Sequence, residues 1–169
     1  MADGGDCGSV QNGRREVRPA LTRGADSLKQ VTFLVVDDNE LDVEKVEKGF
    51  TRLKISNPLV RAKDGFEALE VLRGSATVPK LAKPYVILLD VNMPRMTGIE
   101  FLHELRAEPA LADSAVVVLT TSDRKEDVEA AYENQVAGYI VKPISRDDML
   151  AALSKLDAYW NLCTLPVGD

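Results

Sequence analysis

The amino-acid sequence predicts an α/β fold in which one parallel β-sheet carries helices on both faces. Short, continuous apolar runs alternate along the chain with stretches in which apolar residues recur every three or four positions. Uninterrupted apolar runs are typical of strands buried on both faces, as the strands of a parallel sheet are. The alternation repeats five times, which indicates consecutive β-then-α units joined by right-handed crossovers.

Five segments have the composition of strands. Four are nearly continuous apolar runs rich in β-branched residues, and the segment 58–63 is a weaker candidate. In chain order the predicted strands are 31–36, 58–63, 85–89, 115–119 and 139–141.

Helical periodicity follows each predicted strand. The apolar positions are Val43, Val46, Phe50 and Leu53; Phe66, Leu69, Val71 and Leu72; Phe101, Leu102 and Leu105; Val128, Ala131, Tyr132 and Val136; and Met149, Leu150, Leu153 and Leu156. Helix-start signals agree with three of these sets. Thr97 followed by Glu100 fits a capping box, Asp123 followed by Glu126 resembles one, and Ser145 followed by Asp148 is a looser version.

Length and composition indicate one domain with short ends. The chain has 169 residues, which favours a single domain. Residues 1–29 are rich in Gly, Arg and Asp with few large apolar groups, so we expect a disordered tail. The folded domain is expected at 30–160, and 161–169 is expected to be a C-terminal tail and a possible interface.

Charge and cysteine usage narrow the class of protein. The net charge is −6 with no basic cluster, so nucleic acid is not the expected partner. Cys7 and Cys163 lie near opposite ends and form neither a disulfide framework nor a metal motif, which favours a cytoplasmic location. No apolar run approaches the length of a membrane span, so no membrane association is expected.

Polar residues follow the predicted strands where their carboxyl ends should meet. In an open α/β sheet this edge is the functional crevice, and it would gather Asp37, Asp38, Asp90, Thr120 and Lys142. Two carboxylates about 4 Å apart repel by about 4 kcal/mol at an effective dielectric of about 20, so a cation between them is expected.

Hard oxygen ligands favour Mg²⁺. We expect Asp38 and Asp90 to be direct ligands, Asp37 to act largely through water, and the backbone carbonyl of Asn92 to contribute.

Asp90 has a second predicted role, as a nucleophile. A carboxylate oxygen can attack a phosphoryl group and become an aspartyl phosphate. The charge on the transferring group is spread over three oxygens. Lys142 and the hydroxyl of Thr120 are placed to bind two of them. A cis bond before Pro143 is a further expectation, at a turn that proline restricts.

Four motifs together resemble those of response-regulator receiver domains. They are the segments 34–39, 88–94 with Gly98, 118–121 and 139–143, and the match covers about residues 30–157. The resemblance implies a flavodoxin-like, doubly wound (βα)5 fold with a five-stranded parallel sheet in the order 2-1-3-4-5. It also implies a phosphoprotein of a two-component phosphorelay, which takes its phosphoryl group from a histidine kinase.

The resemblance assigns roles by position. Asp90 would be the phosphoacceptor, Asp37 and Asp38 the acid pair, Lys142 the phosphate-binding cation and Thr120 the switch hydroxyl.

Further positions would tune the switch. Tyr139 would be the switch aromatic, and Asn92 and Ser122 would lie near the water that removes the phosphoryl group. Thr121 stands where the family often has alanine, and it would add bulk beside the phosphate.

A finer resemblance concerns the segments 119–122 and 159–166. They are similar to those of stand-alone receivers partnered with phytochrome-type histidine kinases. The resemblance implies a homodimer through the last two βα units and an unidentified downstream protein target. Only twelve residues follow position 157 in this sequence, so output is expected through a protein contact or phosphate relay.

The sequence leaves three alternative functions open. Asp90 and Asn92 faintly resemble the nucleophile loop of haloacid-dehalogenase-like phosphatases and phosphotransferases, but the second acid of that loop is replaced by Asn92. The segment 103–109 resembles the phosphoacceptor box of histidine kinases, yet His103 is expected to be a helix-surface residue. A receiver-shaped scaffold that is never phosphorylated is the third. Apart from chemistry on itself, no turnover of a separate substrate is expected.

Overall fold

The computed structural model describes residues 30–166, which form five strands and five helices in strict alternation. The strands are β1 (Thr32–Val36), β2 (Leu59–Ala62), β3 (Tyr85–Leu89), β4 (Ala115–Thr120) and β5 (Gly138–Val141). The helices are α1 (Glu40–Arg52), α2 (Gly65–Arg73), α3 (Gly98–Ala107), α4 (Lys125–Glu133) and α5 (Arg146–Leu162). All ten predicted elements are present, but α4 ends before Val136, which the periodicity had included in the fourth helix. The segment 1–29, predicted to be a disordered tail, lies outside the described residues.

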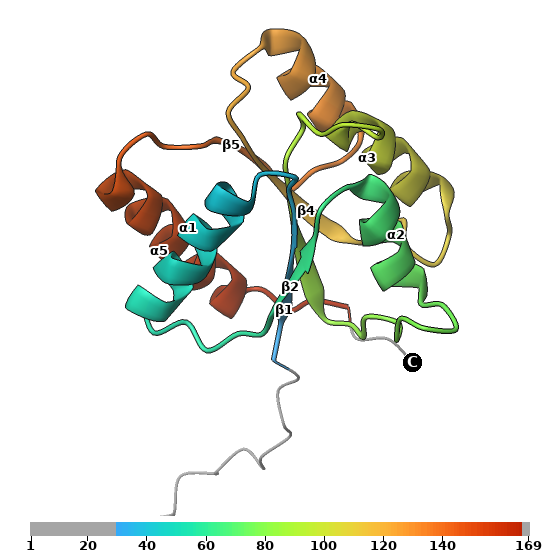
Figure 1. Ribbon diagram of the computed structural model, residues 1–169, viewed down its shortest axis with the longest axis horizontal. Coiled ribbons are helices and arrows are strands. Elements are labelled where there is room, and N and C mark those ends of the chain that lie inside the picture. The colour runs from blue at the N-terminus through green and yellow to red at the C-terminus, as the bar shows by residue number, and fades with distance from the viewer. Residues whose placement is uncertain (1–29, 167–169) are drawn as a thin grey trace, which may run out of the picture.

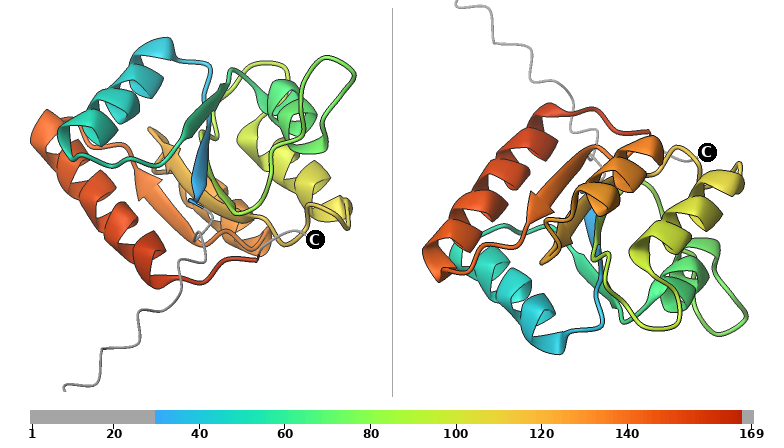
Figure 2. Two further views of the ribbon diagram at one scale, coloured as in Figure 1. Left: turned by 90° about the horizontal axis from the view of Figure 1, so that it is seen from below. Right: turned by 90° about the horizontal axis from the view of Figure 1, so that it is seen from above.

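The five strands form one parallel sheet in the order β2-β1-β3-β4-β5. This confirms the doubly wound fold. The chain moves outward from β1 to β2, then crosses to β3 and continues to β5, so the direction of winding reverses between β1 and β3. Figure 1 shows α1 and α5 on one side of the sheet and α2 and α3 on the other. The two views of Figure 2 show the sheet between these helical layers.

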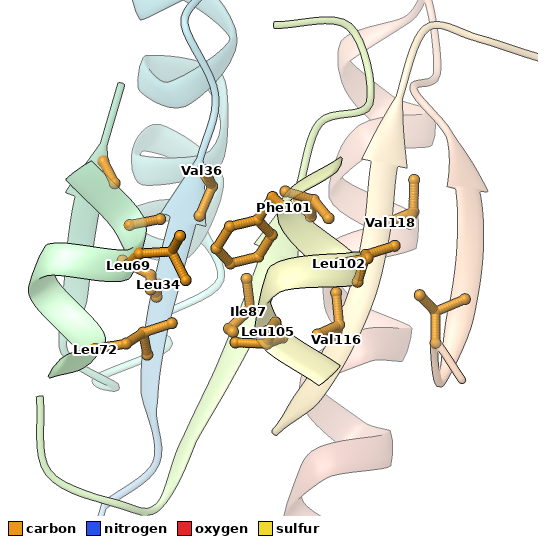
Figure 3. Packing of buried hydrophobic residues seen from close by; sticks show 14 of the residues in the cluster. Leu34, Val36, Leu69, Leu72, Ile87, Phe101, Leu102, Leu105, Val116 and Val118 are labelled. Carbon is orange, nitrogen blue, oxygen red and sulfur yellow. The ribbon is translucent and has the colours of Figure 1, made fainter. Parts of the chain in front are cut away.

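Each face of the sheet has its own apolar core because strand side chains alternate between the faces. On one face, the α2–α3 core includes Leu34, Val36, Leu69, Leu72, Ile87, Phe101, Leu102, Leu105, Val116 and Val118 (Figure 3). On the other, the α1–α5 core includes Phe33, Val35, Val43, Val46, Phe50, Val86, Leu88, Val117, Leu119, Met149, Leu153, Leu156 and Trp160. Burial of β1, β3 and β4 on both faces is the reason their sequences are almost entirely apolar.

Two of the three helix-start predictions are confirmed. Thr97 forms a full capping box with Glu100, and the Ser145 hydroxyl accepts a hydrogen bond from the backbone N–H of Asp148. The prediction for Asp123 is wrong. Helix α4 has Arg124 at its N-cap, without a side-chain cap hydrogen bond, so the chain turns into the helix one residue later than the Asp123 spacing indicated.

The expected cis bond between Lys142 and Pro143 is also wrong. Within residues 30–166 the cis peptide bond is Lys83–Pro84. The trans isomer at Lys142–Pro143 agrees with the intrinsic preference of about 0.5–1 kcal/mol for trans X–Pro bonds.

The large apolar residues at the end of α5 lie partly in the core and partly on the surface. Trp160 is buried in the α1–α5 core, whereas Tyr159 and Leu162 are exposed. The helix continues to Leu162, so the first two residues of the expected tail 161–169 are helical. Over residues 30–166, none of the helices has the length and apolar character that a membrane span requires.

Candidate functional site

The carboxyl ends of four strands bring the predicted site residues to one edge of the sheet. Backbone hydrogen bonds extend the strand ladders beyond the strands themselves. The N–H of Asp37 donates to Ala62 (3.0 Å) and that of Asp90 to Val36 (2.9 Å). The N–H of Lys142 donates to Thr120 at 2.6 Å. The parallel register therefore sets the backbone positions of the site directly.

Three carboxylates gather at this edge. Asp37, Asp38 and Asp90 each offer an oxygen, and these oxygens all lie within 4.8 Å of one another. Asp37 and Asp90 are buried, while Asp38 is exposed. At such separations each pair of charges repels by roughly 3–4 kcal/mol for an effective dielectric of about 20. The donor set consists of carboxylate oxygens, which are hard ligands and fit a Mg²⁺ ion.

Asp90 is the least satisfied of the three acids. It is 6% exposed, and its Oδ1 is buried without a hydrogen-bond partner. Burial, together with the neighbouring charge of Asp37, raises the pKa of Asp90, although Thr120 and Lys142 oppose the shift. A buried carboxylate oxygen without a partner is unfavourable. A cation or a covalently attached group at Asp90 would relieve this.

Lys142 supplies the positive charge of the site. Its Nζ donates to Asp37 Oδ2 at 2.7 Å and to Asp42 Oδ2 at 3.0 Å, and its side chain is 7% exposed. Burial alone would lower the pKa of Lys142, but the hydrogen bonds to Asp37 and Asp42 and the charge of Asp90 outweigh it and raise the pKa. The ammonium is therefore charged and held at the edge of the acid cluster.

Thr120 is connected to Tyr139 through one intervening residue. Thr120 is fully buried, and its Oγ1 accepts a hydrogen bond from the N–H of Ser122 (3.3 Å). The Tyr139 hydroxyl donates to the carbonyl of Ser122 (3.0 Å). Thr120 and Tyr139 therefore bond the two backbone groups of the same residue, Ser122.

The remaining predicted residues lie at different places around the acid cluster or away from it. Thr121 and Asn92 are exposed at the edge. The Ser122 hydroxyl donates to Asp127 Oδ2 in the first turn of α4 at 2.5 Å, so in this structure it is bonded to the helix. His103 lies exposed on α3, with Nε2 3.5 Å from Asn134 Nδ2, which confirms it as a helix-surface residue.

Gly98 allows α3 to begin directly against the acid-bearing loop. A Cβ at this position would overlap the carbonyl oxygen of Asp90 and lie 2.8 Å from the Cα of Val91. Both are backbone atoms, which cannot rotate away. The N–H of Gly98 donates to Val91 (2.9 Å). The glycine of the motif is therefore needed for this close approach.

Sequence reasoning missed a contact between the loop after β3 and the start of α2. The Arg95 guanidinium bonds to the buried carboxylate of Asp64, and it lies over the Phe66 ring, 5.5 Å from the centroid. Asp64 also caps α2 by accepting from the N–H of Glu67 at 2.9 Å. The spacing of Asp64 and Glu67 was the available signal, since it is that of a helix start.

Sequence reasoning also missed Asp42. It lies in the first turn of α1 and bonds Lys142. An acidic residue in the helix that follows the acid pair was the only signal in the sequence.

Comparison with known proteins gives one consistent result. Residues 33–154 match the family model described as the response regulator receiver domain. The chain is 33% identical over 137 residues to the response regulator Rcp1 of Synechocystis sp., a match that covers 80% of this chain and 93% of that protein.

Solved structures agree with this match. The crystal structure of the phosphorylated cyanobacterial phytochrome response regulator RcpA superposes with a TM-score of 0.75 at 29% identity, covering 81% of this chain and 99% of that one. The Mn²⁺-bound form of Rcp1 superposes with a TM-score of 0.72 at 32% identity, with coverage of 81% and 99%.

Proposed function

Because the chain belongs to the response regulator receiver family and takes part in phosphorelay signalling, we propose that Asp90 is its phosphoacceptor. In the proposed transfer, a carboxylate oxygen of Asp90 attacks the phosphorus of a phosphohistidine on a sensor kinase. The new P–O bond forms as the P–N bond breaks, and the electron pair of that bond remains on the imidazole nitrogen. The haloacid-dehalogenase alternative is not favoured by these matches.

The observation that carries this proposal is the state of the Asp90 carboxylate. It is buried beside two other acids, and one oxygen lacks a partner. Asp38, Asp90 and the Asn92 carbonyl are the proposed Mg²⁺ ligands, with Asp37 acting largely through water. Bound Mg²⁺ would neutralise charge on the phosphoryl oxygens. Lys142 would bind a phosphoryl oxygen with an N–H that is not used by Asp37 or Asp42.

The proposed switch runs from Thr120 to Tyr139. The Thr120 hydroxyl would turn from the N–H of Ser122 toward a phosphoryl oxygen on Asp90. The carbonyl of Ser122 accepts the hydrogen bond of the Tyr139 hydroxyl, so a shift of the Ser122 backbone would release the ring. Asn92 and Ser122 would influence the water that hydrolyses the acyl phosphate, and Thr121 would restrict its access.

The proposed kinase contact lies beside this edge, over α1 and the loop that follows β5. A groove of about 450 Å³ there is lined by Lys45, Lys48, Gly49, Arg52, Pro143, Ile144, Ser145, Arg146, Met149 and Leu150. Ile144 is fully exposed and Leu41 is 67% exposed. Apolar residues beside several cations suit an amphipathic helix with acidic flanks on the kinase. Phytochrome-type kinases are the proposed class because the matched structures include a phytochrome response regulator.

A second surface, over β5 and α5, is the proposed site of homodimerisation. A hollow of about 520 Å³ is lined there by Val117, Ala137, Gly138, Ile140, Asp148, Ala151, Ala152, Lys155, Leu156 and Tyr159. Tyr159 and Val141 are each about half exposed. Apolar surface on the last two units is suited to association with a second copy of the chain. The proposed location is the cytoplasm, where a histidine kinase obtains its phosphoryl group from ATP.

Acetyl phosphate tests the proposed function without a kinase. With Mg²⁺, the wild-type chain should gain the mass of one phosphoryl group, and hydroxylamine should remove it. Asp90→Asn should show no gain, whereas Asp123→Asn, at an exposed acid of the loop after β4, should label normally. Labelling of the Asp90→Asn variant at the wild-type level would refute the assignment, and release of many equivalents of phosphate from a phosphomonoester would favour a substrate-hydrolysing enzyme.

A further inference from the structure

We propose that Asp42 competes with the phosphoryl group for the ammonium of Lys142 and thereby limits how readily the phosphorylated state forms. This inference rests on the proposed function of Asp90 and Lys142. Asp42 itself would be a positioning residue, because it acts on the phosphoryl group only through Lys142.

The geometry holds Asp42 firmly against Lys142. Asp42 Oδ2 accepts a hydrogen bond from Lys142 Nζ (3.0 Å), and Oδ1 accepts one from Lys45 Nζ (2.7 Å). The Asn39 side chain donates to Oδ2 as well (3.2 Å). With three donors and a side chain only 12% exposed, the carboxylate is fixed in place. The Asp42 carboxylate thus connects the first turn of α1 to the residue that follows β5.

Lys142 has limited capacity for further bonds. An ammonium group has three N–H donors, and two of them are occupied by Asp37 and Asp42. One donor is left for a phosphoryl group on Asp90. A second bond from Lys142 to the phosphoryl oxygens would require release of Asp42 or Asp37.

The charges around the site favour Asp42 as the competitor. Asp37 belongs to the carboxylate group that can surround a metal ion, whereas Asp42 does not. A bound Mg²⁺ would therefore reduce the attraction between Asp37 and Lys142 more than that between Asp42 and Lys142. Phosphorylation replaces the single charge of Asp90 with about two negative charges. The attraction between position 90 and the Lys142 ammonium then increases. Asp42 keeps its own negative charge and still attracts the same ammonium.

A beryllofluoride titration with Mg²⁺ measures this competition, because the ion mimics an acyl phosphate on Asp90 without chemistry. Fluorine NMR gives its dissociation constant in the full chain. Asp42→Asn should bind beryllofluoride about tenfold more tightly, since an amide oxygen is a weaker acceptor for an ammonium than a carboxylate. Asp42→Glu keeps the charge and should stay within about threefold of wild type.

Glu44→Gln is the matched control. Glu44 lies on α1 and pairs with Lys48, so this variant removes the same unit charge from the same helix without touching Lys142. Its dissociation constant should stay close to that of wild type. A urea unfolding curve for each variant identifies any that fails to fold.

The outcomes separate this inference from the proposed function. Unchanged or weaker binding by Asp42→Asn, while wild type binds normally, would overturn the role of Asp42 alone. An equal gain in Glu44→Gln would reduce the effect to net charge and overturn it too. If Asp42→Asn does not fold, binding by Asp42→Glu tenfold tighter than wild type would contradict the charge competition. Absence of binding by the wild-type chain would instead contradict the proposed function.

Discussion

Removal of the Asp90 charge should stabilise the fold in the absence of divalent cations. The carboxylates of Asp37, Asp38 and Asp90 have oxygens within 4.8 Å of one another, so each pair repels by about 3.5 kcal/mol at an effective dielectric of about 20. Two effects reduce the gain from Asp90→Asn. Asp38 is exposed, so its interaction is screened, and the variant loses the attraction between Asp90 and Lys142. We expect a net gain of about 1–2 kcal/mol in the free energy of unfolding.

The pH dependence of this gain follows from the raised pKa of Asp90, whose ordinary value is 3.8. A carboxyl with a higher pKa in the folded state than in the unfolded state binds protons more readily when folded. Its favourable contribution is therefore present below the unfolded pKa and is lost as the pH rises through the folded pKa. The difference between Asp90→Asn and wild type should be small near pH 4 and should grow as the pH rises to 7.

Urea unfolding in a chelator, at pH 4 and pH 7, measures both effects. Saturating Mg²⁺ should then stabilise wild type by mass action and the variant much less. Asp123→Asn controls for removal of a charge elsewhere. The electrostatic reasoning is refuted if Asp90→Asn is less stable than wild type at pH 7 in the chelator, or if its advantage is largest at low pH.

Two further variants test how the acid-bearing loop is held. Gly98→Ala places a methyl group against the carbonyl of Asp90, so it should lower the free energy of unfolding by about 1–3 kcal/mol and slow phosphorylation by acetyl phosphate; wild-type values for both would contradict the close approach. Arg95→Met leaves the buried Asp64 without its guanidinium partner, so it should destabilise the chain by about 1–2 kcal/mol at pH 7. Burial raises the pKa of Asp64, but the N–H of Glu67 and the guanidinium of Arg95 outweigh it and hold the pKa below its usual value, so this loss should shrink as the pH falls through the Asp64 titration. Because the folded pKa of Asp64 lies below the ordinary value of 3.8, the loss should still be nearly complete at pH 4. An equal loss at pH 7 and at about pH 2.5 in urea unfolding would contradict the ion pair.

Much of this molecule was predictable because a buried parallel sheet leaves a strong pattern in the sequence. Segments such as 85–89 and 115–119 are apolar without interruption since both faces of β3 and β4 are covered. The site followed from the same rule: residues that come directly after parallel strands share one edge. The proximity of Asp90 and Lys142 is therefore a consequence of strand order and could be inferred from sequence alone.

The missed contacts depend on how helices are placed against that edge. Asp42 reaches Lys142 only because α1 begins at Glu40 and turns its first-turn acid toward β5. Arg95 reaches Asp64 from a backbone conformation with φ of 68°, which arginine seldom adopts. The error at Asp123 has a related cause, since the Ser122 hydroxyl, and not Asp123, bonds the start of α4 at Asp127 and at the N–H of Arg124. Neither spacing nor composition determines these details.

Chemical trapping of the phosphoryl group tests the central claim most directly. Borohydride reduces an aspartyl phosphate to homoserine, and peptide mass spectrometry locates the reduced residue after reaction with acetyl phosphate and Mg²⁺. The account predicts a single reduced residue, at position 90. Reduction at Asp37, Asp38 or any other carboxylate in place of Asp90, or no reduction in a chain that has gained a phosphoryl group, would contradict it.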